Sequence, residues 1–278
     1  MPPLKQIEMT EQEKAALEFA ANKLALVLGA SEKFVTEVVE PPVPGSRIDL
    51  AYDADLRDAY DAANLLIVAA EDHLRTILQV LEHGPLPTFA LYTLLRAAAE
   101  AVVRCRHLLD LGIDEPARLG RALNERLDNL QEQNKVKPET QGTHLPDRVE
   151  HLVERATENG IPVLRNQTKD GSVGKRVIGF GEVVKSEVEL FEAYLAAGST
   201  AFRFLSGYVH SKQWVLIPRY GAERAADPGI SMVPTDLNVV HFAGVLDLVV
   251  TLHDENIGYW HILAGLPSDV WRVAKGAA

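Results

Sequence analysis

The sequence predicts an all-α protein, an antiparallel helical bundle that carries one small inserted β-hairpin. Apolar residues recur at helical spacing over most of the chain, while strand-like alternation is confined to one stretch. The segments between the periodic stretches are short, which favours antiparallel neighbours. With 278 residues, of which 47% are hydrophobic and 24% charged, the chain is long enough to bury a core. We expect one domain over residues 1–278, in which residues 1–50 form an N-terminal helix and connector.

The first helix is expected to begin after Thr10 and to end at Gly29. The Thr10 hydroxyl can cap the first turn, while Glu13 reaches back to complete a capping box. Glycine is the usual residue just past a helix C-terminus, so Gly29 is a natural stop. Three prolines lie within residues 34–53, which are therefore predicted to form a connector with a short extended piece.

Four more helices are expected before the hairpin, because apolar stripes repeat there with the helical period. Their predicted ranges are 54–83, 88–111, 115–133 and 147–159. The stretch "HGPLP" marks the end of the first of these helices.

Residues 161–180 read "IPVLRNQTKDGSVGKRVIGF", in which β-branched residues flank an Asp-Gly pair. Asp-Gly between such runs is a strong hairpin signal, so the inserted β-hairpin is expected here. A helix is then predicted over 182–210, with a kink near "AAGST". After a loop that contains proline and glycine, a long helix over 235–262 completes the predicted bundle.

The formal net charge of −11 argues against a nucleic-acid partner, because affinity for phosphates depends on clustered Lys and Arg. The charge is unevenly spread, however. Residues 1–100 hold 8 Lys and Arg against 16 Asp and Glu, a net of −8, whereas residues 201–224 hold four basic side chains against one acid. The second segment, which includes Arg203 and Lys212, is locally basic and permits an RNA partner.

The single cysteine, Cys105, excludes an internal disulfide framework and a zinc site built from several cysteines of one chain. No stretch approaches 18 uninterrupted apolar residues, and the N-terminus is polar and acidic rather than built like a signal peptide. We therefore expect a cytoplasmic protein without a membrane partner.

The stretch "AFRFLSGYVHSKQW", residues 201–214, holds a polar line. Its members are spaced at i, i+3, i+4 and i+7, so on a helix they share one face. They are Arg203, Ser206, Gly207 and His210. Glycine inside a helix costs about 1 kcal/mol relative to alanine, which indicates that another helix or a ligand approaches the backbone there. A structural interpretation is equally open, with Arg203 salt-bridged to a neighbouring helix and with Ser206 and His210 hydrogen-bonded beside it.

A second polar line lies on the predicted helix 88–111, where Arg96, Glu100 and His107 share a face. Arg96 and Glu100 are spaced to pair within that helix. Glu100 is alternatively placed to pair with Arg203, since a buried guanidinium without an acceptor is very costly. We expect the side chains of both lines to face one groove. The alternative for the second line is an ordinary charged helix face exposed to solvent.

The segment "RFLSGYVH" resembles the motif of HEPN domains, in which an Arg is followed by four to six residues and then a His. Taken together, "LLRAAAEAVVRCRHLLD" and "FRFLSGYVH" also resemble bacterial helical families of unknown function that carry an Arg-x3-Glu helix and a Ser-x3-His helix. The resemblance implies a bundle that dimerises, with Arg203 and His210 of both copies lining a cleft where RNA is cut without metal. One position departs from the pattern, because Phe204 stands where HEPN ribonucleases commonly carry a polar residue.

The chemistry of such a cleft is coherent. Cleavage of RNA through its own 2′-hydroxyl needs one group to take that proton and another to protonate the leaving oxygen, and histidine, with an ordinary pKa of about 6.5, suits either role. Two copies of His210 would supply both, and Arg203 suits the doubly anionic phosphorane. No metal or cofactor is needed. The expected substrate-binding residues are Ser206, Gly207, Arg96, Glu100, His107 and Lys212.

Three functions stay open at the level of the sequence. The first is a metal-independent endoribonuclease, a toxin or anti-phage effector whose partners are a second copy, RNA and an antitoxin-type protein. The second is a non-catalytic binding or interaction module in which the Arg/His motif is structural. The third is a small-molecule pocket lined by Trp214, Tyr208 and His210, which has no support from a dinucleotide, P-loop, zinc-protease or di-iron motif.

Overall fold

The computed structural model describes residues 9–37, 41–54, 56–83, 86–87, 89–136, 145–169, 171–210, 239–267 and 271. Within these residues the all-α prediction is confirmed, because helices dominate and β structure is limited to one small antiparallel sheet. The helices are α1 (Glu11–Glu37), α2 (Arg47–Asp53), α3 (Asp58–His83), α4 (Ala90–Leu109), α5 (Glu115–Val136), α6 (Leu145–Glu158), α7 (Glu187–Tyr194), α8 (Gly198–Val209) and α10 (Val239–Leu263). The strands are β1 (Val163–Gln167), β2 (Val173–Phe180) and β3 (Glu182–Val183).

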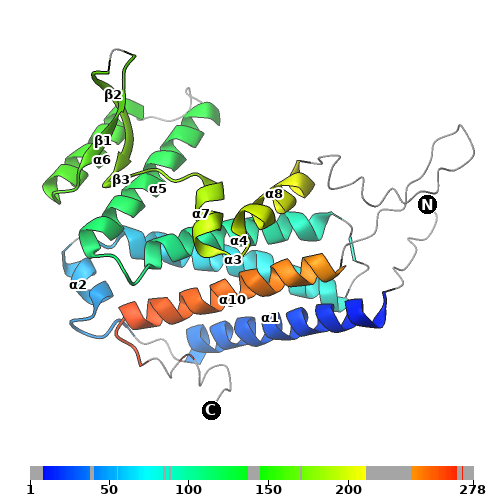
Figure 1. Ribbon diagram of the computed structural model, residues 1–278. Helices are drawn as coiled ribbons and strands as arrows, with labels where there is room; N and C mark the ends of the chain where they lie inside the picture. The colour runs from blue at the N-terminus through cyan, green and yellow to red at the C-terminus, as the bar shows by residue number, and fades with distance from the viewer. Residues whose placement is uncertain are drawn as a thin grey trace, which may run out of the picture.

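The centre of the fold is a bundle of α1, α3, α4 and α10, in which α4 packs against both α3 and α10 (Figure 1). Each helix turns an aliphatic stripe inward, and Leu24, Leu74, Leu95 and Leu246, one from each helix, are fully buried. Burial of such a side chain stabilises the fold by roughly 1.5–3 kcal/mol relative to exposure. The short helices α7 and α8 lie across α4, on the side of the bundle away from α1.

A second layer stands at one end of the bundle, where α5 and α6 pack against the sheet (Figure 1). Leu119 of α5 and Phe180 of β2 lie at its centre and are fully buried. The three strands are antiparallel in the order β1-β2-β3, with Val163 opposite Phe180 and Gly179 opposite Val183. Because α5 also contacts α3 and α4, it joins this layer to the bundle.

The start of α1 is as predicted and its end is not. The backbone N–H of Thr10 donates to Glu13 Oε2 at 2.8 Å, and the N–H of Glu13 donates to Thr10 Oγ1 at 3.3 Å, which together form the expected capping box. The helix continues through Gly29 to Glu37. Gly29 faces solvent, while Leu28 beside it is buried. The core contacts therefore outweigh the roughly 1 kcal/mol that an exposed helical glycine costs.

The predicted connector contains a helix, α2, which the sequence analysis missed. Its N-cap is Ser46, whose hydroxyl accepts a hydrogen bond from the N–H of Asp49. Ile48 and Ala51 stand three residues apart and are both buried, so this single short face is enough to hold the helix on the bundle.

The hairpin at 161–180 is confirmed as β1 and β2, and Gly171 in its turn has a φ of +83°, a conformation that glycine favours. The predicted helix over 182–210 is wrong in two places. Residues 182–183 form β3 rather than helix, and α7 begins only after a capping box between Ser186 and Glu189. The kink is a complete break between α7 and α8.

The remaining helices agree with their predicted ranges to within a few residues, as α3, α4, α5 and α6. For the last helix, α10 covers Val239–Leu263, and the predicted start at 235 lies outside the described residues. None of the helices in the described part of the chain is long and apolar enough to cross a bilayer.

Candidate functional site

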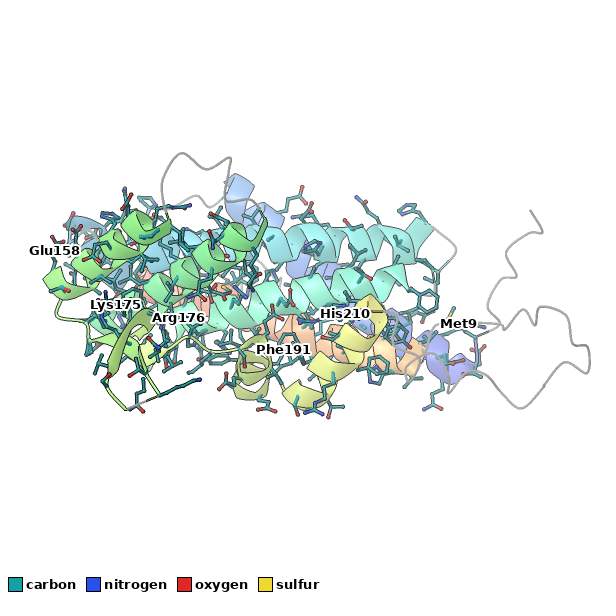
Figure 2. The ribbon with its side chains drawn as sticks, turned by 90° about the horizontal axis from the view of Figure 1, so that it is seen from above. Met9, Glu158, Lys175, Arg176, Phe191 and His210 are labelled. Carbon is teal, nitrogen blue, oxygen red and sulfur yellow. The ribbon has the colours of Figure 1, made fainter. Side chains whose placement is uncertain are left out.

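The two residues predicted to be catalytic, Arg203 and His210, are exposed on α8 and just beyond its end. His210 is the C-cap of α8 (Figure 2). Its backbone N–H donates to the Ser206 carbonyl at 3.0 Å. Within the described ranges, neither the guanidinium nor the imidazole makes a hydrogen bond or an ion pair. Both side chains are therefore open to water, seven residues apart.

The second polar line behaves differently, because Arg96 is built into the interior. Its side chain is only 8% exposed. The guanidinium carbon lies 4.9 Å from the ring centre of Phe191 on α7 and 4.5 Å from that of Phe202 on α8. Arg96 Nε donates to Ser206 Oγ at 3.3 Å. This arginine thus fastens both short helices to α4.

Two carboxylates balance this guanidinium. Arg96 Nη2 lies 2.5 Å from Glu100 Oε1 and 2.8 Å from Glu187 Oε2. Burial raises the pKa of Glu100 to about 7, with Arg96 opposing the rise and the neighbouring Glu187 adding to it. Glu187 also lies 3.6 Å from Arg104, one turn of α4 beyond Glu100.

The predicted pairing of the two lines is therefore only partly correct. The i, i+4 pair between Arg96 and Glu100 is confirmed. The alternative pair between Glu100 and Arg203 is wrong, since Arg203 faces solvent. Ser206 joins the buried line through Arg96, and Gly207 is buried, so the four residues of α8 do not form one wet face.

His107 lies farther along α4 in a separate buried network. Its Nδ1 is 2.9 Å from the Tyr194 hydroxyl, and its Nε2 is 3.2 Å from Glu182 Oε1. Arg121 contacts both partners, with Nη1 3.4 Å from the tyrosine hydroxyl and Nε 3.1 Å from Glu182 Oε1. Burial, with Arg121 and Lys185 nearby, lowers the pKa of His107 to about 3. The ring is neutral at pH 7 and does not face a shared groove with His210.

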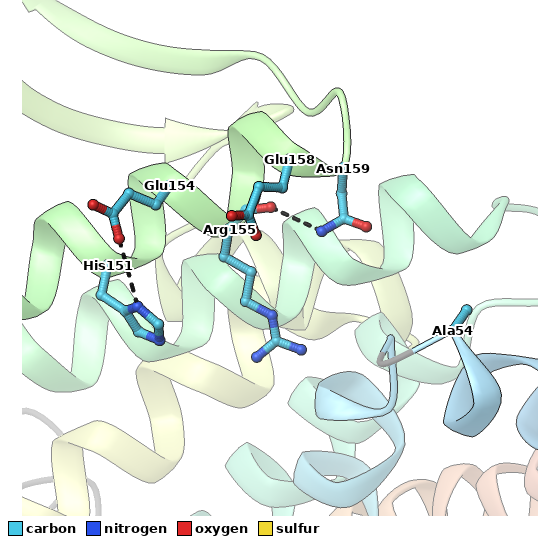
Figure 3. Close-up of a pocket in the computed structure, with 6 residues that line it drawn as sticks. All are labelled: Ala54, His151, Glu154, Arg155, Glu158 and Asn159. Atoms are coloured by element: carbon cyan, nitrogen blue, oxygen red, sulfur yellow. Dashed lines mark hydrogen bonds and ion pairs between the residues drawn. The ribbon is translucent and has the colours of Figure 1, made fainter.

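Neither of the two cavities described next brings the predicted site residues together. A space of about 10 Å³ between α4, α5 and the start of α7, lined in part by Arg104, His107 and Lys185, has room for no more than one water. A larger cavity of about 370 Å³ lies beside α6 (Figure 3). Its lining residues are Ala54, His151, Glu154, Arg155, Glu158 and Asn159. Arg155 already pairs with Asp58 at 2.5 Å, and none of the predicted site residues reaches this cavity.

The described ranges contain no group of three or more His, Cys, Asp or Glu side chains that could hold a metal ion. Lys212 and Trp214 lie outside the described residues. Tyr208, expected to line a small-molecule pocket, is buried and stacks on Tyr92 with ring centres 3.9 Å apart.

Sequence reasoning missed the residues that complete the buried networks, above all Glu187, Tyr194, Glu182 and Arg121. They come from β3, α7 and α5, and each meets α4 only in the folded chain. The capping box at Ser186 is the one local signal that could have placed Glu187 at a helix start.

Comparison of the chain with protein-family models, with curated proteins and with solved structures found no match. The resemblance of "RFLSGYVH" to HEPN domains stays a prediction.

Proposed function

We propose that the protein cleaves RNA without a metal ion, as a homodimer in which Arg203 and His210 of both copies line the cleft. The observation that supports it is the solvent exposure of these two side chains, without a partner among the described residues, on a helix that is otherwise packed by aromatic groups. Charged groups that serve only structure are normally paired when they lie beside a core, as Arg96 is.

In this function His210 of one copy takes the 2′-hydroxyl proton and His210 of the other protonates the leaving oxygen. Arg203 stabilises the phosphorane with its planar, permanently charged guanidinium. Arg96, Glu100 and Ser206 serve as positioning residues, because they are engaged with one another and with α7. Such an activity fits a toxin or anti-phage effector acting in the cytoplasm, held in check by an antitoxin-type protein.

The test is incubation of the purified protein with a mixed pool of RNA in EDTA. We expect cleavage by the wild type and at least a hundredfold loss in His210→Ala, since general acid–base catalysis contributes roughly 10²–10⁴-fold. His151→Ala is the matched control, because His151 is an exposed histidine on α6 and its loss should change nothing. Absence of cleavage over varied RNAs, or equal cleavage by His210→Ala, removes the proposal.

The second candidate is a non-catalytic interaction module, and a specific surface favours it. Phe19 and Leu26 on the outer face of α1 are 65% and 52% exposed. The small residues Ala15, four positions before Phe19, and Gly29, three positions after Leu26, are exposed on the same side of α1. A second copy of α1 packed antiparallel would set large side chains against small ones, so the occupant in this candidate is another copy of the chain.

The two candidates predict different dimers. Because α1 and α8 lie on opposite sides of α4 and α10, pairing through α1 keeps the two α8 helices apart (Figure 1). Light scattering after gel filtration should then show a dimer that Phe19→Ser/Leu26→Ser converts to a monomer. Val173→Ser, at a 77% exposed valine on β2, is the control. A dimer that survives the double substitution contradicts the α1 interface.

A further inference from the structure

Two carboxyl groups meet where α4, α7 and α8 join. Glu100 of α4 and Glu187, the first residue of α7, both contact Nη2 of Arg96, at 2.5 and 2.8 Å, so the two carboxyl groups lie side by side on one nitrogen. Two carboxylates held this close repel each other when both are ionised, and a proton on one of them removes that repulsion. The geometry therefore favours one proton on the pair.

The charges around this pair point the same way. The groups that face it are Arg96 and Arg104 from α4, Glu125 and Asp128 from α5, and the Ser206 hydroxyl from α8. On α7 itself Glu189 is turned to its capping box with Ser186, and Lys185 before it pairs with Glu182. If all four carboxyl groups were ionised, four negative charges would face two positive charges in a partly buried cluster. One bound proton reduces this excess from two negative charges to one.

We propose that Glu100 and Glu187 hold one proton between them at neutral pH, and that loss of this proton loosens α7 and α8 from α4. The same Arg96 that binds the two carboxyls also binds Ser206 and stacks between Phe191 and Phe202. Repulsion between two ionised carboxylates acts directly on this joint. Because α8 carries Arg203 and His210, the packing of the surface formed by these two residues against α4 depends on pH. This holds whether or not the surface cleaves RNA.

The direction of the effect follows from proton linkage. Burial raises the pKa of Glu100 from its ordinary 4.5 to about 7, so the folded chain keeps a proton that the unfolded chain releases. The stabilisation is complete below about pH 4.5 and is lost as pH rises through 7. Buried histidines such as His107, whose pKa is lowered, act with the opposite sign below about pH 6.5. A comparison of variants separates the two effects.

The first experiment measures the melting temperature of the wild type and of Glu100→Gln from pH 5.5 to 8.5. The Gln side chain keeps a donor toward Glu187 and does not titrate. The melting temperature of Glu100→Gln, relative to that of the wild type, should increase by several degrees between pH 6 and 8. Glu154→Gln, at an exposed glutamate of α6, should follow the wild type at every pH. A constant difference between Glu100→Gln and the wild type overturns the proposal.

The second experiment reads the helices themselves. Amide exchange in α7 and α8 of the wild type, normalised to α1 and α10 of the same sample, should accelerate between pH 6 and pH 8. Glu100→Gln should remove that acceleration, and Glu187→Gln replaces it if the first variant does not fold. Equal relative protection of α8 at the two pH values refutes the shared proton. This outcome leaves the RNA-cleavage test untouched, because that test measures what the loss of His210 does to cleavage.

Discussion

At the scale of single residues, the two arginines that begin the two predicted polar lines differ in burial. Arg96 is buried between two aromatic rings with two carboxylates on one nitrogen, whereas Arg203 is exposed to solvent. The pair between Arg96 and Glu100 could be predicted, since i, i+4 spacing is local. Glu187 could not, because it lies 91 residues away and meets Arg96 only after folding. The exposure of Arg203 likewise depends on how α8 sits on α4.

Removal of the buried guanidinium should be severe. Arg96→Ala leaves Glu100 and Glu187 without their shared counter-charge and empties the space between Phe191 and Phe202. We expect a loss of about 3–5 kcal/mol in the free energy of unfolding, measured by chemical denaturation. Arg57→Ala, at a half-exposed arginine, should cost less than about 0.5 kcal/mol. Similar losses in the two variants would mean that Arg96 is not a structural joint.

At the scale of elements, the sequence predicts helices well where their signals are local. Apolar stripes located α3 to α6 to within a few residues, and the Asp-Gly turn located the hairpin. The errors have two causes. α2 exists because its two apolar residues pack into the core, and α1 continues past Gly29 because Leu28 and Ala30 are buried; both depend on contacts distant in sequence, which local periodicity does not contain. β3 is a local error, because it pairs with the end of β2 across a tight turn at Gly181 that the sequence analysis did not recognise.

The break between α7 and α8 gives a prediction at this scale. A Cβ added at Gly198 would overlap the carbonyl of Phe191, so Gly198→Ala should destabilise the protein by about 1–3 kcal/mol. The preceding Ala197 has a φ of +55°, a conformation that costs a non-glycine residue roughly 1–2 kcal/mol. Ala197→Gly should therefore be neutral or slightly stabilising. Thermal denaturation of both variants checks the pair of signs, and a stable Gly198→Ala would contradict the close approach of the two helices.

At the scale of the whole molecule, the buried polar networks hold the helices together, whereas the polar groups on the surface of α8 face solvent. The networks around Arg96 and His107 tie α4 to α5, α7 and α8, and their groups are paired with one another. The surface of α8 instead presents Arg203 and His210 to water. This division leaves the outward side chains of α8 exposed to a partner, on a helix that the Arg96 network fastens to α4. The local positive charge of residues 201–224, within a chain of net charge −11, favours RNA as that partner.

The most direct test of this division is one comparison of Arg203→Ala with the wild type, in which melting temperature and RNA cleavage in EDTA are measured on the same samples. The account predicts an unchanged melting temperature together with loss of cleavage. A melting temperature lowered by several degrees, or cleavage equal to that of the wild type, would contradict it.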